Sequence, residues 1–363
     1  MKKTVIHIVG ARPNFIKAMP LVKAMNKLPI NNLLVHTGQH YDYNMSERFF
    51  EELSIKPDYY LRAGGGSNTT QTAAIMIKCE KLFNELQPNL VIVYGDVNST
   101  LAASLVAKKL HITVAHIESG LRSYDREMPE ELNRIITDSI SDLLFVTCDD
   151  GLDNLRLEGT PVSKCWVVGN TMIDTLVALK DKFTESDILS ENKLVKNNYV
   201  LVTMHRPSNV DNKRALKLLL QSLVQISKKH QVVFPLHPRT SKNIVNFNLE
   251  GITSESDIKF IAPTGYIDFM SLQKNAKLVI TDSGGIQEES SHFNTPCLTV
   301  RDNTERPVTI ENGTNKLIGT SYKNIESEID TIDYNKKSNI KYWDGRSSER
   351  IVKILIDKLE LNK

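Results

Sequence analysis

The stretch ITVAHIESGLRSYDREMPEELNR, residues Ile112 to Arg134, contains an apolar run, a dense group of charged residues and the beginning of a helix. The run Ile112 to Ile117 is typical of a buried strand, and Pro129 suits the first helical turn. We expect the buried face of this helix to consist of the apolar residues at helical spacing, Leu132, Ile135, Ile136, Ile140 and Leu143. The pattern predicts a strand, a polar crossing and a helix, as in a parallel α/β fold.

The same alternation of apolar runs and helical segments extends in both directions. Further strands are predicted at Thr4 to Val9, Asn32 to Thr37, Leu90 to Tyr94, Leu143 to Val146, Trp166 to Val168, Tyr199 to Thr203, Gln231 to Pro235, Asp257 to Ile261, Leu278 to Thr281 and Cys297 to Val300. A chain of 363 residues suits two domains of common size. We predict an α/β protein with two Rossmann-like, doubly wound domains, residues 1–172 and 173–345, facing across a cleft that holds a ligand. A closing helix in 346–363 is expected to dock back toward the N-terminal domain.

Composition excludes several classes of protein. Apolar residues make up 40% of the chain and charged residues 24%, with a net charge of +2, so no basic tract suggests nucleic acid or an anionic membrane. The N-terminal apolar run is too short for a signal peptide, and no window is long enough for a membrane span, so we expect a soluble cytoplasmic protein. The cysteines lack metal-ligand spacing and are expected to be reduced and structural: Cys79, Cys148, Cys165 and Cys297.

Carboxylates follow two neighbouring strands at the point where each strand ends. Asp96 comes after the strand that ends at Tyr94, and Glu118 after the next one. Adjacent parallel strands would bring both carboxylates to the same edge of the sheet. The alternative for Asp96 is a turn or capping role, with Ser99 or Thr100 capping the next helix. Glu130 and Glu131 also fit simple complementation of the helix dipole.

Cations and glycines follow other strands. Arg12 and Lys17 lie in GARPNFIK, beside a predicted helix N-terminus that favours an anion, although solvated surface charges would give the same pattern. The turn DSGGIQEES, residues 282–290, exposes amides that suit a diphosphate, and a carboxylate one turn further on, Glu289, suits ribose hydroxyls. His205 fits either a structural or a catalytic histidine.

Eight motifs in order resemble the non-hydrolysing UDP-N-acetylglucosamine 2-epimerases, from Ile8 to about Ile318. They are GARPNFIK, HTGQHYD, YGDVNSTL, HIESGLRS, MPEELNR, TMHR at 203–206, TDSGGIQEE and RDNTERP. The resemblance implies a glycosyltransferase-B-like fold, a homodimer, and a cytoplasmic role in making nucleotide sugars for surface polysaccharide. It implies no metal and no redox cofactor. It also implies reversible epimerisation at C2 by loss of UDP to a 2-acetamidoglucal intermediate, followed by re-addition.

Residue by residue, the resemblance implies the following roles. The catalytic residues would be Asp96, Glu118, Glu130 and His205. The substrate-binding residues would be Arg12, Lys17, Phe269, Ser283, Gly284, Gly285, Glu289 and Arg306, with Glu289 at the ribose and Phe269 in the uracil pocket. A second UDP-N-acetylglucosamine, as an allosteric activator, would bind Gln39, His40 and Arg206.

Two positions depart from the family pattern, since Asn14 replaces a frequent glutamate and Thr264 replaces a glutamine. The form of the first motif, with HTGQHYD and NMSERFFEEL, also resembles relatives that act on diacetamido-uronic acid sugars. The alternatives left open are therefore a related UDP-2-acetamido sugar as substrate, a hydrolysing epimerase that releases free N-acetylmannosamine, and a glycosyltransferase or nucleotide-sugar binder on the same fold.

Overall fold

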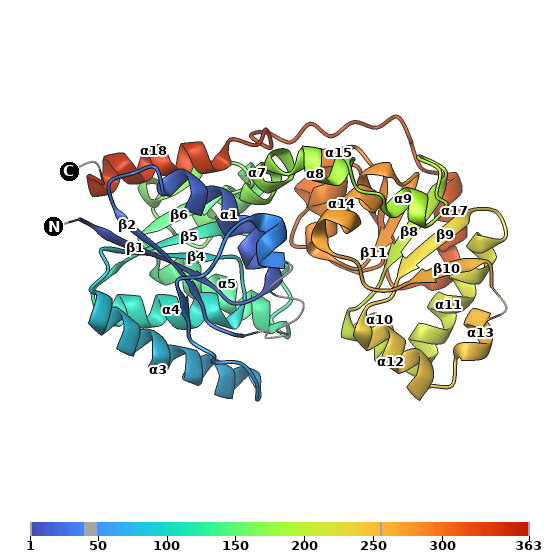
Figure 1. Ribbon diagram of the computed structural model, residues 1–363, viewed down its shortest axis with the longest axis horizontal. Helices are drawn as coiled ribbons and strands as arrows, with labels where there is room; N and C mark the ends of the chain where they lie inside the picture. Colours follow the sequence, from blue (N-terminus) through green and yellow to red (C-terminus); the bar gives the residue numbers. More distant parts are fainter. Residues whose placement is uncertain (1, 40–48, 255, 362–363) are drawn as a thin grey trace. The chain divides into compact units, whose positions relative to one another are not determined.

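The computed structural model describes residues 2–39, 49–254 and 256–361 and divides the chain into two compact units (Figure 1). Unit 1 comprises residues 1–179 and 341–363, and unit 2 comprises residues 180–340. Unit 1 extends beyond the predicted boundary at residue 172 because helix α7 (Thr171–Ala178) packs against α1 (Arg12–Met25). The C-terminal helix α18 (Ser347–Leu359) packs against the same two helices.

Unit 1 is built on a seven-stranded parallel sheet with the order β3-β2-β1-β4-β5-β6-β7. Its strands are β1 (Thr4–Val9), β2 (Asn31–His36), β3 (Tyr59–Tyr60), β4 (Leu90–Tyr94), β5 (Thr113–Ser119), β6 (Leu143–Val146) and β7 (Cys165–Val167). Its other helices are α3 (Asn68–Leu86), α4 (Asn98–Lys109), α5 (Pro129–Ile140) and α6 (Asp149–Leu157), with a 3₁₀ turn at Val162–Lys164. Helices α1, α7 and α18 cover one face of the sheet, and α3, α4 and α5 cover the other (Figure 1).

Unit 2 repeats this plan on a six-stranded parallel sheet with the order β10-β9-β8-β11-β12-β13. Its strands are β8 (Tyr199–Thr203), β9 (Gln231–Pro235), β10 (Ile258–Ile261), β11 (Leu278–Thr281), β12 (Cys297–Thr299) and β13 (Asn315–Leu317). Its helices are α8 (Lys180–Thr184), α9 (Ile188–Glu191), α10 (Pro207–Val210), α11 (Lys213–Ser227), α12 (Pro238–Asn246), α13 (Glu250–Ser254), α14 (Tyr266–Asn275), α15 (Gly284–Phe293), α16 (Val308–Glu311) and α17 (Ile325–Asp330), with a 3₁₀ turn at Tyr322–Asn324.

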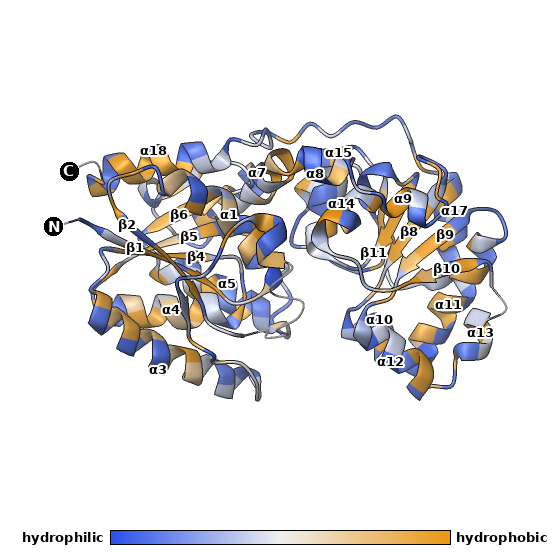
Figure 2. Ribbon diagram, viewed as in Figure 1, coloured by the Kyte–Doolittle hydropathy of each residue, from blue (hydrophilic) through white to orange (hydrophobic). Residues whose placement is uncertain are grey.

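The strands form the cores of both units because each sheet is covered by helices on both faces. In Figure 2 the strands are the most continuously hydrophobic segments. Strand β4 is buried over its whole length, and one face of the second sheet packs on the apolar side of α11. Near-continuous Val, Ile and Leu runs are what a doubly covered parallel sheet requires, which is why these strands were predictable.

One prediction about helix α5 is wrong. Leu132 is 44% exposed and Ile136 is 38% exposed, while Asn133, Arg134 and Asp138 are buried. The polar face turns inward because its side chains bind groups at the ends of β4 and β5, described below. Tertiary polar contacts therefore override the apolar periodicity of this helix.

Helix caps, cysteines and helix lengths allow three smaller comparisons with the sequence. Ser67 caps helix α3 by accepting the amide of Thr70. Neither Ser99 nor Thr100 caps α4, because that helix begins earlier, after Val97. The four cysteines are free and buried, as expected. Across the described residues, no helix combines the length and apolar character that a membrane crossing needs.

Candidate active site

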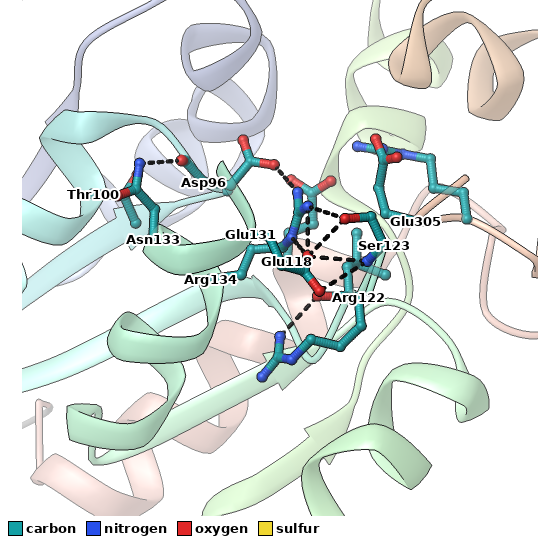
Figure 3. Close-up of polar contacts among 12 residues, drawn as sticks. Asp96, Thr100, Glu118, Arg122, Ser123, Glu131, Asn133, Arg134 and Glu305 are labelled. Atoms are coloured by element: carbon teal, nitrogen blue, oxygen red, sulfur yellow. Dashed lines mark hydrogen bonds and ion pairs between the residues drawn. The ribbon is translucent and has the colours of Figure 1, made fainter. Parts of the chain in front are cut away.

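Asp96 lies in the turn after β4 and is held by a buried arginine. The carboxylate of Asp96 is 27% exposed and forms an ion pair with Arg134 of α5 (Figure 3). Glu131 holds Arg134 in turn, accepting from its Nε at 2.9 Å and its Nη2 at 2.7 Å, and also accepts the amide of Ser123. Burial would raise the pKa of Glu131, but the Ser123 amide and Arg134 outweigh it and lower this pKa. Arg134 therefore has a fixed position from which it aims Asp96.

The sequence predicted that Glu118 follows the end of its strand. In the structure Glu118 lies within β5, because the strand continues to Ser119 through a register shift. Its φ is +71°, an uncommon conformation for a residue with a side chain. Its buried carboxylate forms an ion pair with Lys17, which is also buried, so Lys17 is not a solvated surface charge. A Cβ at Gly95 would lie 3.2 Å from both partners, so a glycine leaves room for this pair next to Asp96. The structure thus brings Asp96, Glu118 and Lys17 together.

Glu130 and Glu131 differ although they are neighbours. Glu130 is exposed in the first turn of α5, on the helix whose Arg134 holds Asp96. Glu131 is buried and binds the Ser123–Tyr124 backbone. Glu130 is therefore the one of the two with an exposed carboxylate, and Glu131 shapes the loop before the helix.

The remaining unit 1 candidates have mixed positions. Arg12 is exposed, with its guanidinium 5.2 Å from the centre of the Phe49 ring. The Gln39 side chain is buried and accepts from the backbone amide of Ser99 at 3.0 Å and from its hydroxyl at 2.8 Å. His40 lies outside the described residues.

In unit 2, Asp282 orients His205. Asp282 follows β11, is fully buried, and accepts the backbone amides of His205 and Arg206. Its carboxylate also lies 3.2 Å from His205 Nδ1. Burial would raise the pKa of Asp282, but its bonds with His205 and Asn209 outweigh it and lower this pKa. With Nδ1 at Asp282 and the ring 39% exposed, Nε2 is the nitrogen that can exchange a proton with a ligand.

A group of arginines surrounds Glu305 near the start of α15. Glu305 lies 2.8 Å from Arg301, is paired with Arg306, and lies 4.0 Å from Arg206. Burial would raise the pKa of Glu305, but Arg306 and Arg301 hold it far below its usual range. A Cβ at Gly284 would come 2.5 Å from Arg306 Nη1, so the guanidinium packs against this glycine.

The first turn of α15 provides amides beside these guanidinium groups. Ser283 is the N-cap residue, and Gly284 and Gly285 are the first two helical residues. Helix N-termini favour anions, and a neighbouring guanidinium adds charge and donors. One turn further, Glu289 is buried near Tyr266. Burial raises the pKa of Tyr266, and the nearby charge of Glu289 raises it further. Phe269 of α14 is half-buried against the apolar cluster beneath α9.

Sequence reasoning missed five residues that hold these groups, Glu131, Arg134, His116, Asp138 and Asp282. The only sequence signal of four of them is position, in or beside a motif that ends a strand or begins a helix, whereas Asp138 lies in the last turn of α5 and has no such signal. Within the described ranges, no group of three or more His, Cys, Asp or Glu side chains could hold a metal ion.

Comparison with known proteins identifies the family. The sequence model described as UDP-N-acetylglucosamine 2-epimerase matches residues 23–356. The chain belongs to the UDP-N-acetylglucosamine 2-epimerase family. The UDP-N-acetylglucosamine 2-epimerase of Methanocaldococcus jannaschii is 44% identical, over 96% of this chain and 97% of the relative. The UDP-2,3-diacetamido-2,3-dideoxy-D-glucuronate 2-epimerase of Pseudomonas aeruginosa is 39% identical, over 97% of this chain and 99% of the relative.

A solved structure agrees with this assignment. The M. jannaschii UDP-GlcNAc 2-epimerase, crystallised with UDP-GlcNAc and UDP, superposes with a TM-score of 0.90 at 42% identity, over 98% of this chain and 99% of that one. The protein is therefore an epimerase of the UDP-N-acetylglucosamine 2-epimerase family, with two Rossmann-like units of the glycosyltransferase-B-like class.

Proposed function

We propose that this protein reversibly converts UDP-N-acetylglucosamine to UDP-N-acetylmannosamine without net hydrolysis. The observation that carries the proposal is the pair of carboxylates, Asp96 and Glu118, held by buried cations at the ends of adjacent strands. No carbonyl lies beside C2 of the sugar to acidify its hydrogen. Removal of that proton therefore has to accompany loss of UDP from C1, which gives 2-acetamidoglucal and UDP.

Inversion at C2 requires a proton to leave from one face and return to the other. Asp96 and Glu118 are ionisable groups on adjacent strands, with Glu118 beside Gly95, the residue before Asp96. Glu130 is exposed on the helix whose Arg134 holds Asp96. We assign the acid–base steps to these three carboxylates and to His205. We divide the steps among the three carboxylates as a set rather than giving one to each.

Departure of UDP places negative charge on a diphosphate. The amides of Gly284 and Gly285, the side chain of Ser283 and the guanidinium of Arg306 are suited to hold that charge, while the Ser283 amide donates to Thr281. Glu289 would hold the ribose and Phe269 the uracil, with Arg12 and Lys17 contributing from unit 1. Support comes from the M. jannaschii structure, whose ligands are UDP-GlcNAc and UDP.

Incubation with UDP-N-acetylglucosamine in heavy water tests the reaction. We expect deuterium at C2 by NMR and a product that remains UDP-linked by mass spectrometry. Free UDP and free N-acetylmannosamine in equal amounts would instead identify a hydrolysing epimerase. Absence of deuterium at C2 would exclude epimerisation and favour a transferase or a binding protein.

A second substrate is favoured by one specific finding. The P. aeruginosa relative, 39% identical over nearly the whole of both chains, is an epimerase of a diacetamido-glucuronate. The same carboxylates would serve that sugar, because it differs in substituents rather than in the bonds that break. Competition between the two UDP-sugars, scored as a ratio of kcat/KM, decides between them.

We also propose that the protein is a homodimer. The outward apolar face of α5 supports this, because Leu132 and Ile136 are exposed at helical spacing while the polar face is buried. Replacing both by lysine should produce a monomer in sedimentation experiments. The matched control, Leu157→Lys, changes a residue on α6 that is 84% exposed and should not alter the mass. A wild-type monomer would exclude the dimer.

Two further expectations belong to the same proposal. A second UDP-N-acetylglucosamine would activate the enzyme through Gln39, His40 and Arg206. The reverse reaction would then remain slow until a little UDP-N-acetylglucosamine is added, and a normal initial rate without it would exclude activation. A cytoplasmic location is predicted as well, and cell fractionation tests it.

A further inference from the structure

The turn that carries Asp96 is held by side chains at three consecutive carbonyls. The carbonyl of Tyr94 accepts at 2.9 Å and 2.7 Å, that of Gly95 at 2.8 Å, and that of Asp96 at 2.9 Å. Asn14 and Thr100 bind the carbonyl of Tyr94, His116 binds that of Gly95, and Asn133 binds that of Asp96. His116 differs from the others because it lies on β5, two residues before Glu118. It therefore links the turn of one carboxylate to the strand of the other.

The ring of His116 is fully buried between two acceptors. Its Nε2 faces the Gly95 carbonyl, and its Nδ1 lies 2.7 Å from a carboxylate oxygen of Asp138 on α5. A carbonyl and an ionised carboxylate only accept hydrogen bonds. Both ring nitrogens therefore face groups that only accept, and Asp138 places a negative charge beside the ring. Burial would raise the pKa of Asp138, but His116 and Arg122 outweigh it and lower this pKa.

Asp138 also holds the chain on the other side of Glu118. Its second oxygen accepts the amide of Gly120 at 3.1 Å and lies 2.7 Å from Arg122 Nη1. Asp138 thus fixes the backbone two residues after Glu118 directly, and two residues before it through His116. Between these points Glu118 has a φ of +71° at the register shift of β5. Such a conformation persists only where the surrounding contacts enforce it.

We propose that Asp138, acting through His116 and the Gly120 amide, is a positioning residue that sets the spacing of Asp96 and Glu118. The role rests on the proposed function, since it matters only if both carboxylates act on one carbon. Neither Asp138 nor His116 carries a proton to or from the sugar, because both are buried and fully bonded to protein. Their effect is to keep the carboxylates of Asp96 and Glu118 at a fixed distance from each other.

Asp138→Asn tests this role because it keeps the shape of the side chain and removes the negative charge that faces Nδ1 of His116. We expect kcat to fall about 30- to 100-fold, since small misplacements of catalytic groups have effects of this order. The KM and the affinity for UDP should stay within about threefold. His116→Gln, whose amide can donate to only one of the two acceptors well, should give a similar loss and replaces Asp138→Asn if that variant does not fold.

Asp142→Asn is the matched control. Asp142 follows the same helix, accepts the amide of Val114 at 2.8 Å, and lies 2.8 Å from Lys108, so it fixes β5 at its opposite end. This variant should lower the Tm without changing kcat. If Asp138→Asn also lowers only the Tm, the role is merely structural and the proposal is wrong.

A second measurement does not depend on activity. In protein labelled with nitrogen-15 at histidine, the His116 ring, assigned from its absence in His116→Gln, should show protons on both nitrogens. In Asp138→Asn it should show one. A neutral ring in the wild type would overturn the proposal. If the wild type turns over no UDP-sugar, both the proposed function and the positioning role are wrong. If the wild type is active and Asp138→Asn has the same kcat, only the positioning role is wrong.

Discussion

The two units hold their functional side chains in opposite ways. In unit 1 buried cations hold carboxylates, with Lys17 on Glu118 and Arg134 on Asp96. In unit 2 buried carboxylates hold cations and a histidine, with Asp282 on His205 and Glu305 on the arginines. The groups that we assign to the ligand are therefore mainly carboxylates in unit 1 and mainly cations and amides in unit 2.

This difference indicates a division of chemical work. Carboxylates that are held in position are suited to taking a proton from carbon and returning it, whereas guanidinium groups and helix amides are suited to a departing diphosphate. A site that only bound a nucleotide sugar would have no need for the carboxylates of unit 1. The comparison can be tested by removing charges from each unit in turn.

The largest effect is expected from the presented carboxylates of unit 1. Glu118→Gln and Asp96→Asn should each lower kcat by about 10³-fold, because an amide cannot take or return the proton. Binding of UDP, measured by calorimetry, should remain, since most of the groups that we propose for the diphosphate lie in unit 2. Glu127→Gln, on the exposed loop before α5, is the control and should keep the wild-type rate. A wild-type rate in Glu118→Gln or Asp96→Asn would contradict the assignment.

The next effect concerns the buried acid of unit 2. Glu305→Gln removes the carboxylate that Arg301 contacts and leaves Arg306 paired with Glu288, and it should cost about 3 kcal/mol of unfolding free energy at pH 7. The pKa of Glu305 in the folded state lies below its ordinary value of 4.5. Its stabilisation is therefore complete above pH 4.5 and is lost as pH falls through the folded-state pKa, so wild type and variant should converge in acid.

Chemical unfolding at a series of pH values measures this difference. Glu326→Gln is the control, because the Glu326–Lys229 pair is exposed and exposed pairs contribute little. A constant gap between wild type and Glu305→Gln down to low pH would show that the loss is one of packing rather than charge.

The strands could be read from the sequence because their burial is encoded locally. The bounds of β4, β6, β8, β9 and β11 are those predicted, since a strand covered on both faces needs an unbroken apolar run. The same reasoning placed Asp96 and Glu118 at the ends of adjacent strands. It also placed the glycine turn proposed for the diphosphate on a different strand from the carboxylates.

The supporting residues could not be read in this way. The buried face of α5 depends on Arg134 reaching Asp96 and on Asp138 reaching His116, contacts between residues far apart in sequence. For this reason the apolar periodicity predicted that the opposite face of α5 would be buried. Likewise, the strand that contains Glu118 continues past Ile117 only because a register shift and Asp138 hold it, and neither leaves a local pattern.

A smaller effect is expected from the α15 turn. In Gly284→Ala the new Cβ would lie 2.5 Å from Arg306 Nη1 and 2.7 Å from Glu305, so the guanidinium has to move away from the helix amides. We expect the Kd for UDP to rise about 10-fold, the order of one weakened charged contact. Gly251→Ala is the matched control, because a Cβ at Gly251 would meet nothing within 4 Å. Equal UDP affinity in both variants would remove this turn from the diphosphate site.

The smallest effect is expected from Arg12, the exposed cation of unit 1. If unit 2 supplies most of the anion binding, Arg12→Gln should raise KM only about threefold and leave kcat unchanged, because an exposed guanidinium on an aromatic ring contributes little. Steady-state kinetics on UDP-N-acetylglucosamine measure both values. A loss larger than that of Gly284→Ala would place the main anion contact in unit 1. The contrast between the two units would then hold for proton transfer but not for binding of the diphosphate.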